Sequence, residues 1–157
     1  MNNIRRFNEA EHLRIRQAIE AAEKKTSGEL RIFIDDECGP NVLDKAAHVF
    51  NKLGMQKTAL RNGVLIYLAM SSRQFAVIGD AGIHQHVGDE FWHSIRTEMQ
   101  FHFISGDFIT GLETAIIKIG TELSKYFPFE NGDRNELSDE IAYGFNEQQE
   151  EKIKVTR

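Results

Sequence analysis

Two short apolar runs, joined by a polar turn, constrain the fold of this chain more than any other feature. Residues 63–70 are dominated by valine, leucine, isoleucine and other apolar side chains, and residues 74–79 form a second β-prone run. Only Ser-Ser-Arg lies between them, so the two runs predict a β-hairpin. Because the first run is apolar without alternation, it is typical of a central strand that is covered on both faces.

A helix, a strand and a second helix are predicted ahead of this hairpin. Asn8 and Glu11 form a capping box, and apolar residues at helical spacing predict an amphipathic helix over residues 8–25. Strict alternation from Glu29 to Asp35 predicts a strand. The second helix, over residues 41–53, makes the connection to the hairpin a crossover, so the two strands that it joins should be parallel.

Two more helices are predicted after the hairpin, over residues 89–100 and 107–126. The Gly79-Asp80-Ala81-Gly82 segment ahead of them is interpreted as an acidic loop punctuated by glycine. The expected fold class is therefore α/β, an α/β/α sandwich in which a small mixed sheet of three to four strands is flanked by about four helices.

The chain length and its charge pattern suggest one domain followed by a tail. A chain of 157 residues has the size of a single domain. We assign residues 1–128 to the α/β domain and residues 129–157 to an acidic carboxy-terminal extension, which holds eight acidic and four basic side chains. Alternating Ile141, Tyr143 and Phe145 predict a short additional strand, and the charged residues from Glu147 onward predict a frayed end.

The composition argues against several classes of protein. The net charge of −5 and the lack of a basic run disfavour nucleic acid as a partner. The single cysteine, Cys38, excludes an intramolecular disulfide. The sequence has no long apolar run and no signal-peptide pattern, so we expect no membrane insertion and, if the sequence is complete, a cytoplasmic protein. We expect a monomer and can name no protein partner.

The first candidate site is the acidic run Asp35-Asp36-Glu37, which follows the first predicted strand. Ligands of open α/β sheets bind beyond the carboxyl ends of the parallel strands. Clustered carboxylates repel one another until a cation arrives, and Ca²⁺ and Mg²⁺ prefer oxygen ligands. The run therefore predicts a divalent-cation site; the alternative is a solvated turn.

The second candidate is Asp80 within the glycine loop, because glycine lets a backbone approach an ion closely. The alternative is an ordinary turn at the end of a strand. Since the third strand should run antiparallel, Asp80 is expected at the opposite sheet edge from Asp35, next to Asn62 and Glu29. One site that includes both acids would require a different topology.

The third candidate is a histidine cluster. His84 and His86 form a His-x-His pair in what we interpret as a strand-like segment, and His93 follows in the next helix. Imidazoles at such spacing can bind a transition metal, although the spacing matches no strong zinc signature. Histidines at the surface or at a helix entry are the better interpretation.

Several motifs, taken in order, resemble the TPM domain family of small α/β proteins from bacteria and plastids. The matching segments are Thr26-Ser27-Gly28-Glu29-Leu30, Asn62-Gly63-Val64-Leu65, Gly79-Asp80-Ala81-Gly82-Ile83, and the later set Phe103, Gly106, Gly111 and Leu112. The resemblance covers residues 8–128, and residues 135–141 are similar to the ending of short soluble bacterial members.

The resemblance implies an α/β/α sandwich with an acidic cleft. It also implies calcium or magnesium binding, as in some relatives, and an acid phosphatase activity, which has been attributed to plant members in the context of photosystem II repair. We therefore expect a domain that binds Ca²⁺ or Mg²⁺ through Asp35, Asp36, Glu37 and Asp80, with dissociation constants of about 10⁻⁴ to 10⁻³ M. The alternatives are a metal-assisted phosphatase, with Asp35 or Asp36 as ligand or base, and a non-catalytic interaction domain. Whether the protein is an enzyme stays open here.

Overall fold

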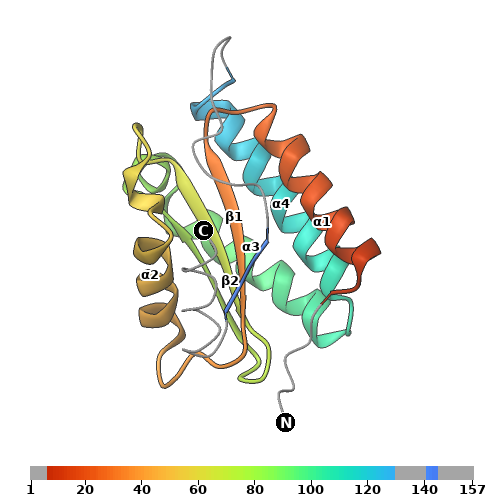
Figure 1. The fold of residues 1–157 in the computed structure, drawn as a ribbon. Helices are drawn as coiled ribbons and strands as arrows, with labels where there is room; N and C mark the ends of the chain where they lie inside the picture. Colours follow the sequence, from red (N-terminus) through yellow and green to blue (C-terminus); the bar gives the residue numbers. More distant parts are fainter. Residues whose placement is uncertain (1–6, 130–140, 145–157) are drawn as a thin grey trace, which may run out of the picture.

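A mixed β-sheet forms the middle layer of the protein (Figure 1). The computed structural model describes residues 7–129 and 141–144. Within these residues the helices are α1 (Glu9–Glu23), α2 (Val42–Lys52), α3 (Ala81–Ile104) and α4 (Phe108–Tyr126), with a short 3₁₀ helix, η1 (Met55–Lys57). The strands are β1 (Glu29–Asp35), β2 (Gly63–Ala69), β3 (Gln74–Gly79) and β4 (Ala142–Tyr143).

The strand order is β3-β2-β1-β4, which confirms the predicted mixed sheet. β1 and β2 are parallel, and their register places Asp35 beside Ala69. β3 returns antiparallel along β2, as the short turn predicted. The additional strand predicted from the tail is β4, which pairs in parallel with β1, while Phe145 lies outside the described residues.

Helices cover both faces of the sheet (Figure 1). α2 lies on one face, and α1, α3 and α4 lie on the other. Every residue of β2 is buried, because its side chains alternate between the two cores. Val64, Ile66 and Leu68 face the three-helix side, whereas Leu65 and Tyr67 face α2.

Side-chain caps fix the beginnings of the first two helices. The capping box predicted for α1 is present: Asn8 Oδ1 accepts from the Glu11 N–H at 2.8 Å, and the Asn8 N–H donates to Glu11 Oε1 at 3.1 Å. Asn41 caps α2 by accepting from the backbone N–H of Leu43 and Asp44. These two helices therefore begin and end within a few residues of the predicted ones.

The start of α3 corrects the sequence analysis. The helix begins at Ala81 rather than at residue 89, so the predicted glycine loop and the strand-like segment at His84 were wrong. A Cβ at Gly82 would overlap the Leu60 carbonyl, so only glycine lets the first turn of α3 lie this close to the preceding loop. Gly88, with φ of 71°, interrupts the helix, which is why a helical pattern was visible only after it.

The acidic extension contributes to the same sheet as the rest of the domain. Ile141 is buried, and Tyr143 stacks on His12 of α1 with ring centroids 6.2 Å apart. The boundary at residue 128 stays a prediction, and the frayed end predicted from Glu147 onward lies outside the described residues. None of the helices within residues 7–129 combines the length and the apolar character needed to cross a membrane.

Candidate functional site

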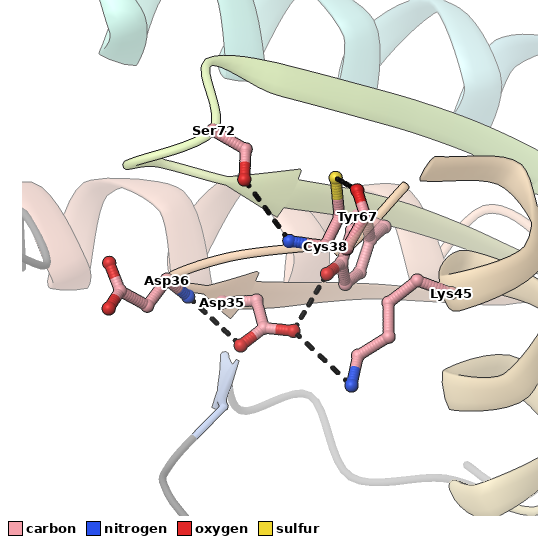
Figure 2. A network of polar contacts seen from close by, with 7 residues as sticks. Asp35, Asp36, Cys38, Lys45, Tyr67 and Ser72 are labelled. Carbon is pink, nitrogen blue, oxygen red and sulfur yellow. Dashed lines mark hydrogen bonds and ion pairs between the residues drawn. The ribbon is translucent and has the colours of Figure 1, made fainter. Parts of the chain in front are cut away.

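Asp35 lies at the carboxyl end of β1, on the sheet face that is covered by α2. Its side chain is mostly buried, and Oδ2 accepts a hydrogen bond of 2.7 Å from the hydroxyl of Tyr67. Oδ1 accepts from the backbone N–H of Asp36 at 2.9 Å, and the Lys45 ammonium lies 4.0 Å from Oδ2 (Figure 2). Each oxygen of this carboxylate therefore already has a donor, and the Lys45 ammonium faces Oδ2.

Tyr67 places a hydroxyl group in a strand whose other side chains are apolar. The residue is fully buried, and its ring lies 6.0 Å from the ring of Phe33 on the neighbouring strand, at an interplanar angle of 14°. Burial raises the pKa of Tyr67 far above its ordinary value, and the hydrogen bond to Asp35 raises that pKa further. Tyr67 therefore stays a neutral donor beneath the Asp35 carboxylate.

Asp36 faces away from Asp35. Figure 2 shows the two carboxylates pointing apart, as expected for consecutive residues at the end of a strand. The Asp36 carboxylate accepts a hydrogen bond from the Ser71 hydroxyl in the hairpin turn. The Asp36 carbonyl accepts from the Ser71 N–H at 2.9 Å, so Asp36 connects the end of β1 to the turn between β2 and β3.

The loop after Asp36 runs along the same turn. The Cys38 N–H donates to the Ser72 hydroxyl at 3.2 Å, and the buried Cys38 thiol donates to the Gly39 carbonyl at 3.4 Å. Glu37, between Asp36 and Cys38, is exposed. The loop is thus held in place while the Glu37 carboxylate remains open to solvent.

The end of β4 lies directly against Asp35. The Gly144 N–H donates to the Ile34 carbonyl at 2.5 Å, which extends the pairing of β4 with β1. A Cβ at Gly144 would overlap Oδ1 of Asp35, so only glycine allows the chain to approach the carboxylate at this point. The carboxy-terminal segment therefore helps to enclose the Asp35 side of the sheet edge.

Asp80 lies at the other edge of the sheet, as predicted. Its backbone N–H donates to the Gly63 carbonyl at 2.9 Å, beside the start of β1 at Glu29. Its side chain accepts two hydrogen bonds from Arg61, at 2.7 and 2.8 Å, and one from the Ala81 N–H at 2.7 Å. Asp35 and Asp80 therefore cannot belong to one site, and Asp80 caps α3.

The candidate histidines have separate surroundings. His84 Nδ1 accepts from the Trp92 indole N–H at 3.0 Å, and its Nε2 lies 3.6 Å from Asp89. The His86 ring stacks on Tyr126 with centroids 4.5 Å apart. Among the residues that the structure describes, no group of three or more His, Cys, Asp or Glu side chains is arranged to hold a metal ion.

Three neighbours of Asp35 were missed by the sequence analysis: Lys45, Tyr67 and Gly144. One signal for Tyr67 was present, because a single hydroxyl within an apolar strand needs a buried partner. The parallel register with β1 would then have suggested the acid at the end of the neighbouring strand. Nothing in the sequence pattern indicated Lys45 or Gly144.

The comparisons with known proteins agree with this fold. A family model described as the TPM domain matches residues 3–122. The NMR structure of the BA42 protein from the psychrophilic bacterium Bizionia argentinensis is similar, with 41% identity and a TM-score of 0.83, over 92% of this chain and 100% of that one. The amino-terminal domain of the cg2496 protein from Corynebacterium glutamicum shares the fold at 10% identity and a TM-score of 0.58, over 90% of this chain and 82% of that one. No curated protein matches the chain.

Proposed function

The chain belongs to the TPM domain family, and from this membership together with its acidic sheet edge we propose that it binds a divalent cation, Ca²⁺ or Mg²⁺, at Asp35, Asp36 and Glu37. The observation that carries the proposal is the position of these consecutive carboxylates beyond the carboxyl ends of β1 and β2. This edge is where open α/β sheets bind their ligands.

The chemistry of the donors fits a hard cation. Asp36 and Glu37 offer carboxylate oxygens at the surface, and Ser71 adds a hydroxyl next to Asp36. Asp35 adds a third carboxylate at the end of β1, which accepts from Tyr67 and from the Asp36 N–H. Such a site of a few loop carboxylates is expected to bind with a dissociation constant of about 10⁻⁴ to 10⁻³ M.

The proposal leaves out Asp80, although the sequence analysis included it. Both oxygens of Asp80 accept from Arg61, and one of them also accepts from the first N–H of α3. A cation at Asp80 would have to displace both the Arg61 guanidinium and the hydrogen bond from the Ala81 N–H. The two acidic positions are therefore assigned different roles, cation binding at one edge and helix capping at the other.

The proposal stops at binding and does not include hydrolysis of a phosphate ester. Hydrolysis needs a group that binds the phosphoryl oxygens and a base that takes a proton from the attacking water. The hydrogen bonds of Asp35 and Asp36 to Tyr67, to the backbone and to Ser71 indicate neither of these roles. Cation binding alone is therefore the function that we propose.

A titration of amide chemical shifts tests the proposal. The cation-stripped protein is titrated with Ca²⁺ and then with Mg²⁺ while the amides of residues 35–37 and of Ser71 are followed. We expect saturable shifts there, and we expect Asp36→Asn to weaken binding at least about tenfold, the loss of one charged ligand. Glu90→Gln, which removes an exposed carboxylate from α3, is the matched control and should leave the titration unchanged.

Three other results would overturn parts of this assignment. Diffuse shifts that grow linearly with salt would remove the cation site. Saturable shifts centred on residues 79–82 would move the site to the opposite edge. Turnover of p-nitrophenyl phosphate that is lost in Asp36→Asn and kept in Glu90→Gln would show a phosphatase instead of a binding domain.

A further inference from the structure

A hollow of about 570 Å³ opens beside the hairpin, on the sheet face opposite Tyr67. It lies where β2 and β3 meet the end of α3 and the first turn of α4. Its apolar walls come from Leu68, Met70, Phe75, Phe103, Ile104 and Phe108. The volume is within the range of sites for small organic ligands. A shallower hollow adjoins it and shares Arg73, Gln74 and Phe75. We call the two together the Arg73 groove.

The aromatic wall of the groove is built by contacts between its own members. The Phe103 ring lies edge-on to Phe75 at 5.1 Å and stacks on Phe108 at 4.8 Å. Gly111 of α4 makes room for Phe103, because a Cβ there would press against that ring. Ile104 next to it is 79% exposed, so apolar surface continues from the hollow to solvent. The wall therefore offers a fixed apolar surface to a bound molecule.

The charge of the groove is the opposite of the charge of the chain. Arg73 and Arg96 line it together with His93, and no aspartate or glutamate does. Neither arginine forms an ion pair with a carboxylate among the residues that the structure describes. The chain as a whole has a net charge of −5. A groove with two arginines and no acid is complementary to an anion.

The backbone of Arg73 adds an independent observation. Arg73 has a φ of 54°, in the left-handed region, where a non-glycine residue costs about 1 kcal/mol or more. Arg61 is the other described non-glycine residue with positive φ, and its side chain forms the bidentate pair with Asp80. At Arg61 a glycine would fit the backbone better, but it would lack the guanidinium that binds Asp80. The same conformation at Arg73 points to a use for its guanidinium as well.

From these observations we propose that the Arg73 groove binds a small amphipathic carboxylate. The carboxylate head is bound by the planar guanidinium of Arg73, which matches it with two parallel hydrogen bonds. The apolar body lies between Phe75, Phe103 and Phe108, where it removes exposed apolar surface from water. This site shares no residue with the cation site, because none of Asp35, Asp36, Glu37 and Ser71 lines the groove.

Decanoate, used below its micellar concentration, is the probe for this proposal. Amide and methyl shifts of the full chain are followed as decanoate is added, and we expect saturable changes at Arg73, Phe103, Ile104 and Phe108. 1-Decanol lacks the carboxylate and acetate lacks the long apolar chain, so both should bind more weakly than decanoate. Decanoate is titrated into the cation-stripped protein and Ca²⁺ into the decanoate-free protein, so failure of the cation site and failure of this site are distinguishable.

Arg73→Gly is the decisive variant. Glycine accepts a φ of 54° without strain, so the variant should be as stable as the parent chain or more stable, while its affinity for decanoate falls about tenfold with the loss of a charged hydrogen-bond partner. Lys57→Gly, at an exposed position of η1, removes another cation and should leave the affinity unchanged. Ile104→Gln, at an exposed wall position, should weaken binding without unfolding the protein.

Three outcomes would overturn the proposal. Decanoate that binds Arg73→Gly as well as the parent chain, or that produces no saturable shift at the groove, would exclude a carboxylate site there. Groove shifts that change on dilution of the protein alone, together with a dimer in sedimentation, would identify a second copy of the chain as the occupant instead.

Discussion

Arg61 holds the carboxylate of Asp80 at both oxygens, Nε to Oδ2 at 2.7 Å and Nη2 to Oδ1 at 2.8 Å. The same carboxylate accepts from the Ala81 N–H and begins α3. Arg61 reaches it from a left-handed backbone conformation in the loop ahead of β2. The pair thus fastens the start of the longest described helix to the edge of the sheet, and the acid in the glycine segment has a structural role.

Two replacements of Asp80 should destabilise the fold to different degrees. Asp80→Asn keeps a capping side chain but loses the charge, whereas Asp80→Ala loses both and should lower the free energy of unfolding by about 1–2 kcal/mol. Urea denaturation monitored by circular dichroism measures both variants. Glu90→Ala, at an exposed position of the same helix, should change stability by less than about 0.5 kcal/mol. An unchanged midpoint for Asp80→Ala would contradict this role.

Removing the hydroxyl of Tyr67 should leave Oδ2 of the buried Asp35 carboxylate without its hydrogen-bond donor. Tyr67→Phe keeps the ring against Phe33 and is expected to lower the free energy of unfolding by about 1–3 kcal/mol. In an Asp35→Ala background the same change should cost much less, since the acceptor is gone. The double-mutant cycle gives the coupling directly, and equal costs in both backgrounds would refute a specific hydrogen bond.

The raised pKa of Tyr67 predicts an alkaline loss of stability. At neutral pH the phenol is protonated in both the folded and the unfolded state, so the stabilisation is fully present. Above the ordinary value of 10.0 the unfolded chain releases this proton and the folded one retains it, so the free energy of unfolding falls by about 1.4 kcal/mol per pH unit. Chemical denaturation at a series of alkaline pH values should show a shallower decline for Tyr67→Phe than for the parent chain.

Gly144→Ala should disturb Asp35 although residue 144 is far from it in the sequence. The new Cβ would overlap Oδ1, so either β4 or the carboxylate must move, at a cost of about 1–3 kcal/mol. Thermal unfolding and the amide shift of Asp36, which donates to the same oxygen, report the two effects. In the Asp35→Ala background the cost should largely disappear, and persistence of the full cost there would point to another cause.

Lys45→Met should raise the affinity for Ca²⁺. The ammonium lies 4.0 Å from Asp35 and opposes a cation at the same edge. Because Lys45 is 40% exposed, solvent screens it, and we expect a gain of only about two- to fivefold. Calorimetric titration at low salt measures the gain, which should shrink at high salt. Lys57→Met, outside this edge, should leave the affinity unchanged, and a loss of affinity in Lys45→Met would contradict the assigned position of the site.

Local sequence patterns predicted most of the fold because the pattern and the packing agree. The alternation in β1 and the continuous apolar run in β2 reflect one strand beside the next in a sheet covered on both faces. The long connection between β1 and β2 then predicted a parallel pair, and the short turn between β2 and β3 predicted an antiparallel pair. The start of α3 was missed because Gly82 and Gly88 are helix breakers by propensity, whereas here Gly82 makes a close backbone approach possible.

The surroundings of the acidic edge could be predicted only in part. The sequence places Asp35, Asp36 and Glu37 at the end of a parallel strand, and it separates them from Asp80 by topology. It does not indicate that Asp35 and Asp36 point apart, that Tyr67 lies beneath one of them, or that Gly144 covers it. These contacts join segments distant in the chain, and no local periodicity encodes them.

The shortness of β4 has a consequence for the order in which the protein opens. Its two residues pair with Phe33 and Ile34 near the end of β1, across more than a hundred residues of chain, so few hydrogen bonds offset a long loop closure. Contacts of this kind form late in folding and are the first to be lost in local unfolding. The Gly144 amide should therefore exchange its hydrogen with solvent faster than the amides of β2. Each such opening uncovers the Asp35 carboxylate while the rest of the sheet stays folded.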